Sequence, residues 1–168
     1  MPRRLLRDGR IVDDDWSYAT AAGDATAPLI LSFAQWQNER EFLSARGGRL
    51  GVILQPAHRV ELLASDISGF TLIGAEFSGP GEGRGYSQAR LLREQYNFRG
   101  ELRATGYVRR DQIFLMARCG FNSFELPEAD LEAARAALST FSRAYQPAND
   151  AGLPLKLQRR RPDIPASA

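Results

Sequence analysis

The stretch "EGRGYS" at residues 82–87 combines residue types that bind anions. Its glycines leave backbone N–H groups accessible, and it opens onto a helical run whose first turn would carry partial positive charge. The glycines alternate at every second position, which fits neither a Walker loop nor a G-x-G-x-x-G fingerprint, so no phosphate geometry is specified. We expect a small anion to be bound here by Arg84, Gly85, Tyr86 and Ser87.

A second loop, "TGYVRRDQ" at 105–112, repeats this arrangement before the next helical run. It adds Arg109, Arg110 and Gln112, and its arginines could meet the first loop around one anion if the preceding strands are neighbours. For each loop, a purely structural role remains an open alternative to anion binding. Ser87 and Asp111 would then cap their helices while the arginines point to solvent.

Acid–base chemistry has four candidate carboxylates, although no spacing rule pairs them. They are Glu76, Glu82, Asp111 and Glu125. The chain has one histidine and one cysteine, which excludes an intrachain disulfide and a Cys/His zinc site, and no metal site is expected. We interpret His58 as a surface residue and Cys119 as a buried apolar residue. Redox chemistry would therefore need a borrowed organic cofactor, of unknown type, or a partner's metal centre.

The elements that must position these residues alternate regularly. Apolar runs and amphipathic stretches follow one another five times, which is typical of parallel strands with helical crossovers. We predict an α/β fold with about five mostly parallel strands, in an open Rossmann or flavodoxin-like sheet. The alternative is a partial TIM-barrel-like βα array; both would bind ligands at the carboxyl ends of strands. The expected strands are 28–33, 50–54, 69–77, 100–107 and 121–126, and the expected helices 34–46, 57–67, 86–97, 109–119 and 127–145.

Three regions are expected along the chain. Residues 1–27 are predicted as an extended N-terminal arm, 28–146 as the α/β domain and 147–168 as an extended or disordered tail. Within the arm, Asp8-Gly9 is a hairpin signal. The motif "DDDW" at 13–16 either straps aromatic side chains into a groove or docks a partner.

Composition indicates an ordinary globular protein. The chain has 168 residues, of which 43% are hydrophobic and 25% charged, with a net charge of +2. This mild charge does not favour nucleic-acid binding. No apolar run approaches the ~20 residues that span a bilayer, and no signal core follows the N-terminus, so we expect a cytoplasmic protein without a membrane segment.

The run 83–126, "GRGYSQARLLREQYNFRGELRATGYVRRDQIFLMARCGFNSFEL", resembles the bacterial domain-of-unknown-function family 934. The segments "DDDW" and "PLILSFAQW" are also similar to that family's pattern, which usually has "DGRGYS" where Glu82 stands here. The resemblance implies a role in assimilatory sulfite reduction, within sulfur assimilation and cysteine biosynthesis. It brings no established catalytic residues.

Two functional hypotheses follow. The chain is an accessory protein that supports or docks with sulfite reductase, the partner implied by the resemblance. Alternatively, it is an oxidoreductase or anion-binding enzyme of sulfur assimilation that uses a borrowed phosphate-bearing cofactor. Whether it is an enzyme is left open by the sequence.

Overall fold

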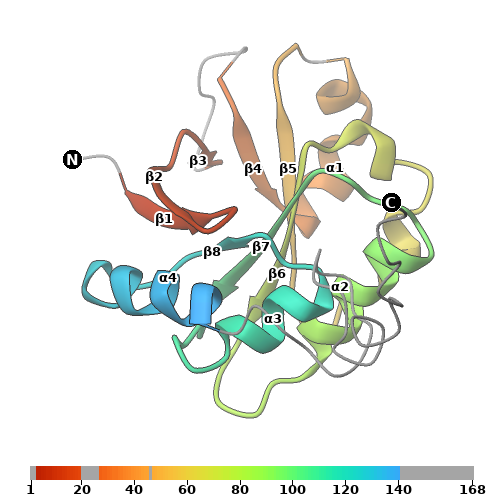
Figure 1. The fold of residues 1–168 in the computed structure, drawn as a ribbon. Coiled ribbons are helices and arrows are strands. Elements are labelled where there is room, and N and C mark those ends of the chain that lie inside the picture. The colour runs from red at the N-terminus through yellow and green to blue at the C-terminus, as the bar shows by residue number, and fades with distance from the viewer. Residues whose placement is uncertain (1–2, 20–26, 46, 141–168) are drawn as a thin grey trace, which may run out of the picture.

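The computed structural model describes residues 3–19, 27–45 and 47–140, which form one mixed eight-stranded sheet with helices on its outer face (Figure 1). The strand order is β2-β1-β8-β7-β6-β5-β4-β3. The strands are β1 (Arg4–Arg7), β2 (Arg10–Asp13), β3 (Ser17–Tyr18), β4 (Leu29–Ser32), β5 (Leu50–Leu54), β6 (Leu72–Phe77), β7 (Glu101–Gly106) and β8 (Ser123–Phe124). The α-helices are α1 (Phe33–Ser44), α2 (Arg84–Glu94), α3 (Ile113–Cys119) and α4 (Leu131–Thr140), and the 3-10 segments are η1 (Val60–Leu63), η2 (Ile67–Gly69) and η3 (Glu128–Asp130).

The predicted α/β class is confirmed, but the expectation of about five mostly parallel strands is wrong. All five expected runs form strands, β4 to β8, and these run parallel to one another. The N-terminal residues add three more, because β3 pairs with β4 in parallel while β1 pairs with β8 and β2 in antiparallel fashion. These added strands are two to four residues long and carry little periodic signal.

Two local signals have different outcomes. The Asp8-Gly9 hairpin is confirmed, since both residues have positive φ (49° and 73°) between paired strands. The stretch 57–67 is not an α-helix but the two 3-10 segments η1 and η2. Its apolar positions Val60, Leu63 and Ile67 are nevertheless buried, so the spacing identified the buried side correctly and the helix type wrongly.

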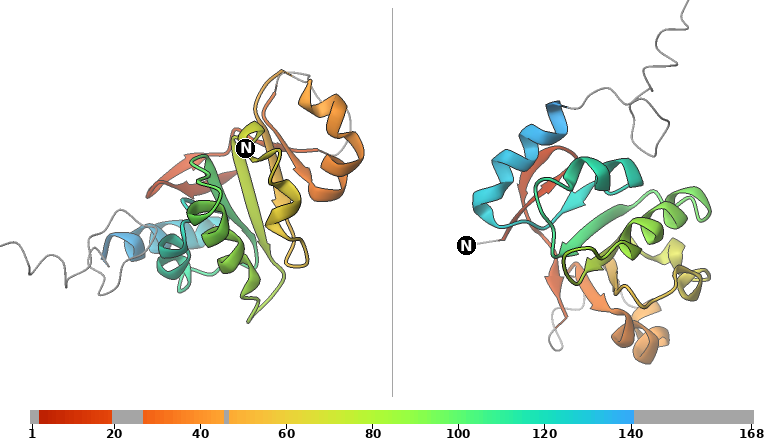
Figure 2. Two further views of the ribbon diagram at one scale, coloured as in Figure 1. Left: turned by 90° about the vertical axis from the view of Figure 1, so that its right-hand side faces the viewer. Right: turned by 90° about the horizontal axis from the view of Figure 1, so that it is seen from below.

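The sheet curls into a half-barrel (Figures 1 and 2). Its edge strands β2 and β3 are consecutive in the chain, and only residues 14–16 separate Asp13 from Ser17. Four residues of extended chain reach at most ~14 Å, so the two edges must lie close together. The segment 14–16, which we call the closing segment, therefore joins one edge of the curled sheet to the other.

The main apolar core lies between the convex face of the sheet and the helices. It includes Leu31, Val52, Ile73 and Leu102 from alternate positions of four parallel strands, together with residues of all four α-helices. The opposite face of the same strands points inward, and much of it is polar. None of the helices in the described ranges is long and apolar enough to cross a membrane. The predicted tail, residues 147–168, lies outside the described residues.

Candidate functional site

A cavity of about 360 Å³ opens inside the curled sheet at the carboxyl ends of its parallel strands. Ligands of parallel sheets and barrels bind at this end. Its polar lining comes from the last inward-facing positions of the parallel strands, and the edge strand β3 forms one side. The lining residues are Tyr18, Ala19, Ile30, Ser32, Gln35, Ile53, Glu76, Thr105, Gly106 and Glu125.

Glu76 is the carboxylate left available in this cavity. It is the last inward-facing residue of β6 and is half-buried. Among the described residues, its side chain has no hydrogen-bond or ion-pair partner, whereas most other acids near the cavity have one. Below it, Gly74 leaves space that the Ile53 side chain fills, since a Cβ at Gly74 would lie 2.3 Å from Ile53 Cδ1. Glu76 is thus positioned above an apolar floor, where it can accept a hydrogen bond or a proton from a ligand.

Glu125, across the same cavity, is fixed by several donors. Its Oε1 accepts hydrogen bonds from Tyr18 Oη (2.7 Å) and Arg103 Nη1 (3.2 Å), and Arg3 lies 3.3 Å away. Burial raises the pKa of Tyr18, and the neighbouring Glu125 carboxylate raises it further. Tyr18 therefore remains a protonated donor, and Glu125 serves to orient this side of the cavity.

Arg103 supports the cavity from below. Its side chain is fully buried, and it forks onto Asp14 through two 3.0 Å hydrogen bonds while contacting Glu101 at 2.7 Å. Burial alone would lower the pKa of Arg103, but hydrogen bonds to Asp14 and the charges of Glu101 and Asp14 outweigh it and raise the pKa. Burial likewise opposes the charge of Asp14, yet hydrogen bonds from Arg103 and Arg3 hold the pKa of Asp14 below its ordinary value. The buried charges thus compensate one another.

The closing segment supplies much of this interior. Asp14 and Trp16 point inward, and Trp16 packs with Ile30, Ile53 and Leu72 in a separate apolar cluster. Asp15 contacts Arg49, whose guanidinium also lies 4.9 Å from the Trp16 ring centroid. The "DDDW" motif therefore closes the half-barrel in this structure, which places Trp16 as a strap residue. A docking role of the motif stays untested.

The rim opposite Glu125 is formed by the start of α1. Ser32 and Gln35 make reciprocal bonds, because Ser32 Oγ accepts from the Gln35 N–H (3.2 Å) and Gln35 Oε1 accepts from the Ser32 N–H (2.8 Å). This is a capping box at the first turn of the helix. Gln35 Nε2 also donates to the Ala19 carbonyl (3.1 Å), which holds the end of β3 against the rim.

The two arginine-bearing loops follow the neighbouring strands β6 and β7, as the anion hypothesis required. The start of α2 is already occupied, because Glu82 Oε1 accepts the Arg84 N–H at 2.9 Å. In the second loop, Arg109 pairs with Asp111 at 3.0 Å. An external anion would have to compete with these carboxylates, and binding there stays a prediction that includes Arg110 in the same exposed turn.

The alternative in which Ser87 and Asp111 cap their helices is not what the structure shows. Gly83 is the N-cap of α2, so Ser87 lies inside the helix, where it is exposed. Gln112, not Asp111, is the N-cap of α3. Neither N-cap residue makes a side-chain capping hydrogen bond. Packing explains part of the "GRGY" motif instead. A Cβ at Gly85 would lie 2.6 Å from the Phe77 ring, and Tyr86 stacks edge-on against the same ring at 5.2 Å.

The single histidine and single cysteine lie away from the cavity lining. His58 is half-buried, with its ring 4.4 Å from that of Phe33 and Nδ1 accepting the Gln55 N–H. Cys119 is buried as expected, and burial raises the pKa of its thiol. Such a thiol is a poor nucleophile at neutral pH. No group of three or more His, Cys, Asp and Glu residues in the described parts of the chain could hold a metal ion.

Sequence reasoning singled out Glu76 and Glu125 but missed their surroundings. The signal was present in β7, where Glu101, Arg103 and Thr105 alternate with buried apolar residues. Buried parallel strands usually read as continuous apolar runs, so a polar residue at every second position indicates a polar inner face. Tyr18 and Ser32 carried no comparable signal, because only the curl of the sheet brings them to the cavity.

Comparison with known families identifies a match. The model of a family described as "Bacterial protein of unknown function (DUF934)" matches residues 51–156, which include Glu76, Arg103 and Glu125. No curated protein matches the chain significantly. The match covers well over half of the sequence, and the chain belongs to the DUF934 family of bacterial proteins of unknown function.

Proposed function

We propose that the chain acts in assimilatory sulfite reduction as a protein that binds a small polar molecule in the cavity of the curled sheet. The observation that carries this proposal is the Glu76 carboxylate, which lines the cavity without a partner among the described residues. The pathway comes from the family resemblance of residues 83–126.

The chemistry of the cavity favours a ligand that donates hydrogen bonds. Glu76 offers two acceptor oxygens, while the Tyr18 hydroxyl is already donated to Glu125 and Arg103 is neutralised by carboxylates. A bare oxyanion such as sulfite would face Glu76 without a free cation, which is unfavourable. A ligand with hydroxyl or amino groups fits better, and Glu76 is the group that could take a proton from it.

The test is complementation of a deletion strain on sulfate without added cysteine. We expect the deletion to cause cysteine auxotrophy, the wild-type gene to restore growth and Glu76→Gln to fail. Glu132→Gln is the matched control, since Glu132 is exposed on α4 and its partner Arg135 lies on the same helix. Growth of the deletion strain without cysteine would reject the role in sulfite reduction. Full complementation by Glu76→Gln would reject the cavity as the functional site.

A second candidate is the accessory role on sulfite reductase. It is supported by the family resemblance of residues 83–126 and by the cysteine content, because the one cysteine, Cys119, is buried and has no second cysteine with which to form a redox pair. Electrons would then come from a partner or from a phosphate-bearing cofactor at the two arginine loops. Co-purification of tagged protein with sulfite reductase from cells grown on sulfate is expected; its absence after crosslinking would count against docking.

A further inference from the structure

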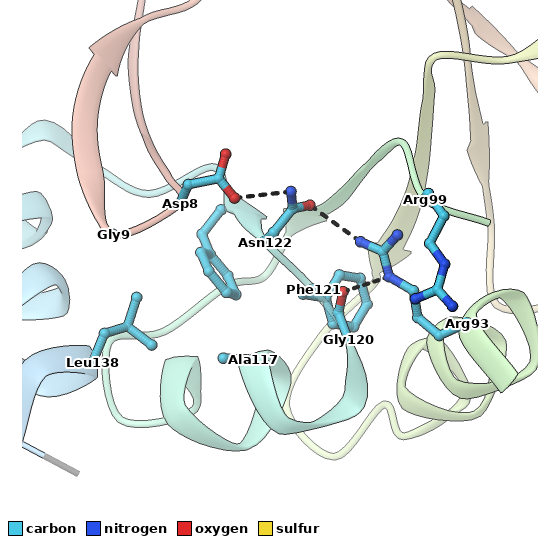
Figure 3. Close-up of a pocket in the computed structure, with 10 residues that line it drawn as sticks. Asp8, Gly9, Arg93, Arg99, Ala117, Gly120, Phe121, Asn122 and Leu138 are labelled. Carbon is cyan, nitrogen blue, oxygen red and sulfur yellow. Dashed lines mark hydrogen bonds between the residues drawn. The ribbon is translucent and has the colours of Figure 1, made fainter. Parts of the chain in front are cut away.

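A second cavity, of about 690 Å³, lies at the opposite, amino-terminal end of the strands (Figure 3). It is surrounded by residues just before β7 and β8, by the β1–β2 turn and by the helices α2, α3 and α4. This cavity shares no lining residue with the one around Glu76. Its lining residues are Asp8, Gly9, Arg93, Arg99, Ala117, Gly120, Phe121, Asn122, Phe124 and Leu138.

Arg93 is held rigidly at one side of this cavity. Its Nε donates to the Gly120 carbonyl (2.9 Å), and its Nη1 donates to the carbonyls of Phe98 (2.6 Å) and Gly100 (3.0 Å). Only Nη2 remains loosely engaged, at 3.4 Å from Asn122 Oδ1. Burial lowers the pKa of Arg93, and the neighbouring positive charge of Arg99 lowers it further.

Arg99 provides a second cation beside the first. It is exposed, and within the described ranges no carboxylate reaches it. Figure 3 shows the two guanidinium groups side by side on the same wall, while Asp8 lies across the cavity and accepts a 3.0 Å hydrogen bond from Asn122 Nδ2. Asp8 is the one carboxylate among the described lining residues, and its charge acts on Arg93, so the two guanidinium groups leave a net positive charge at the cavity. Such a pair attracts an oxyanion, because planar N–H groups match carboxylate and phosphate geometry.

The rest of the wall is apolar. Phe121 and Phe124 are buried residues around β8, and Ala117 and Leu138 come from α3 and α4. A cavity of this size and composition suits a small organic ligand. We propose that it binds an amphiphilic organic anion, with a carboxylate or phosphate head on the two arginines and an apolar body against the phenylalanines. This site is independent of the function proposed for the Glu76 cavity.

The test is a titration of the isotopically labelled full chain, followed by amide NMR shifts. The probes are octanoate, octyl phosphate, the neutral octanol and inorganic phosphate. We expect octanoate or octyl phosphate to shift the amides of Gly120, Phe121 and Asn122, with octanol and inorganic phosphate binding at least about tenfold more weakly, because each lacks one half of the recognised chemistry. The preference between the two anionic probes identifies the head group.

Variants separate the arginine wall from non-specific binding. Arg99→Gln, at an exposed position, should weaken the anionic probes about tenfold, as expected for loss of a charge-assisted hydrogen bond. Arg59→Gln, at an exposed arginine in the loop that follows β5, should leave binding unchanged. The proposal would be overturned if octanol and octanoate bound equally well, or if Arg99→Gln left the affinity for the anionic probes unchanged. It would also be overturned if the amide shifts were confined to other regions, or if neither anionic probe bound at millimolar concentration.

Discussion

Arg103 and Asp14 are 89 residues apart in the sequence and form a two-pronged pair, with both hydrogen bonds at 3.0 Å, inside the curled sheet. Both side chains are at most 1% exposed. The pair ties the central strand β7 to the closing segment, so it couples the cavity to the closure of the half-barrel. Loss of either partner leaves a charge in a buried site.

Arg103→Leu should destabilise the fold by about 3–5 kcal/mol, because Asp14 and Glu101 lose their buried counter-charge. Urea unfolding followed by circular dichroism measures the change. Arg135→Leu is the control and should cost no more than about 1 kcal/mol, since its ion pair with Glu132 is exposed. Similar midpoints for the two variants would contradict the assigned role of Arg103.

Acid should weaken the folded state through Asp14. Its pKa is lower in the folded protein than the ~3.9 of an unfolded chain, so its stabilising contribution is complete above that value and is lost as the pH falls below about 4. We expect the free energy of unfolding to decrease in this range. Asp14→Asn should be less stable at neutral pH and show a flatter decrease, whereas the exposed Asp13→Asn should keep the wild-type slope. Parallel curves for all three proteins would exclude Asp14 as the titrating group.

Gly85→Ala should destabilise the protein although alanine favours helices. The new Cβ would lie 2.6 Å from the Phe77 ring, and such overpacking costs about 1–3 kcal/mol. Gly83→Ala is the matched substitution, since nothing lies within 4 Å of a Cβ there. Thermal unfolding should therefore give a lower midpoint for Gly85→Ala than for Gly83→Ala, and the reverse order would show that Phe77 moves aside freely.

Trp16→Ala should cost about 3–5 kcal/mol, the usual range for truncating a buried tryptophan. Trp16 is 6% exposed and fills the inner face with Ile30, Ile53 and Leu72. Trp16→Phe keeps most of the apolar contact and should lose less. Chemical unfolding distinguishes them, and a cost below about 1 kcal/mol for Trp16→Ala would mean that the closing segment contributes little to the closed interior.

Periodicity located the framework well and the site only in part. The runs that became β4 to β8 were recognisable because buried parallel strands are apolar. The curl corresponds to the partial TIM-barrel-like alternative, but its closure carried no sequence signal, because it depends on β1 pairing with β8, which is distant in the sequence. Glu76 and Glu125 were identified as strand-end acids, but their different surroundings follow from that closure. Glu125 is fixed by Tyr18 and arginines, whereas Glu76 has no partner among the described residues.

The pairing of β1 with β8 also shapes how the chain can fold. Leu6 finds its partner Phe124 only after nearly all of the domain has been synthesised, whereas β4 to β8 add to one another in sequence order. Pairings so distant in sequence slow folding. During synthesis, the Asp8-Gly9 hairpin cannot pair with β8 until Phe124 has been made. Arg103 and the cavity above it therefore reach their final environment only after this late-made strand is available.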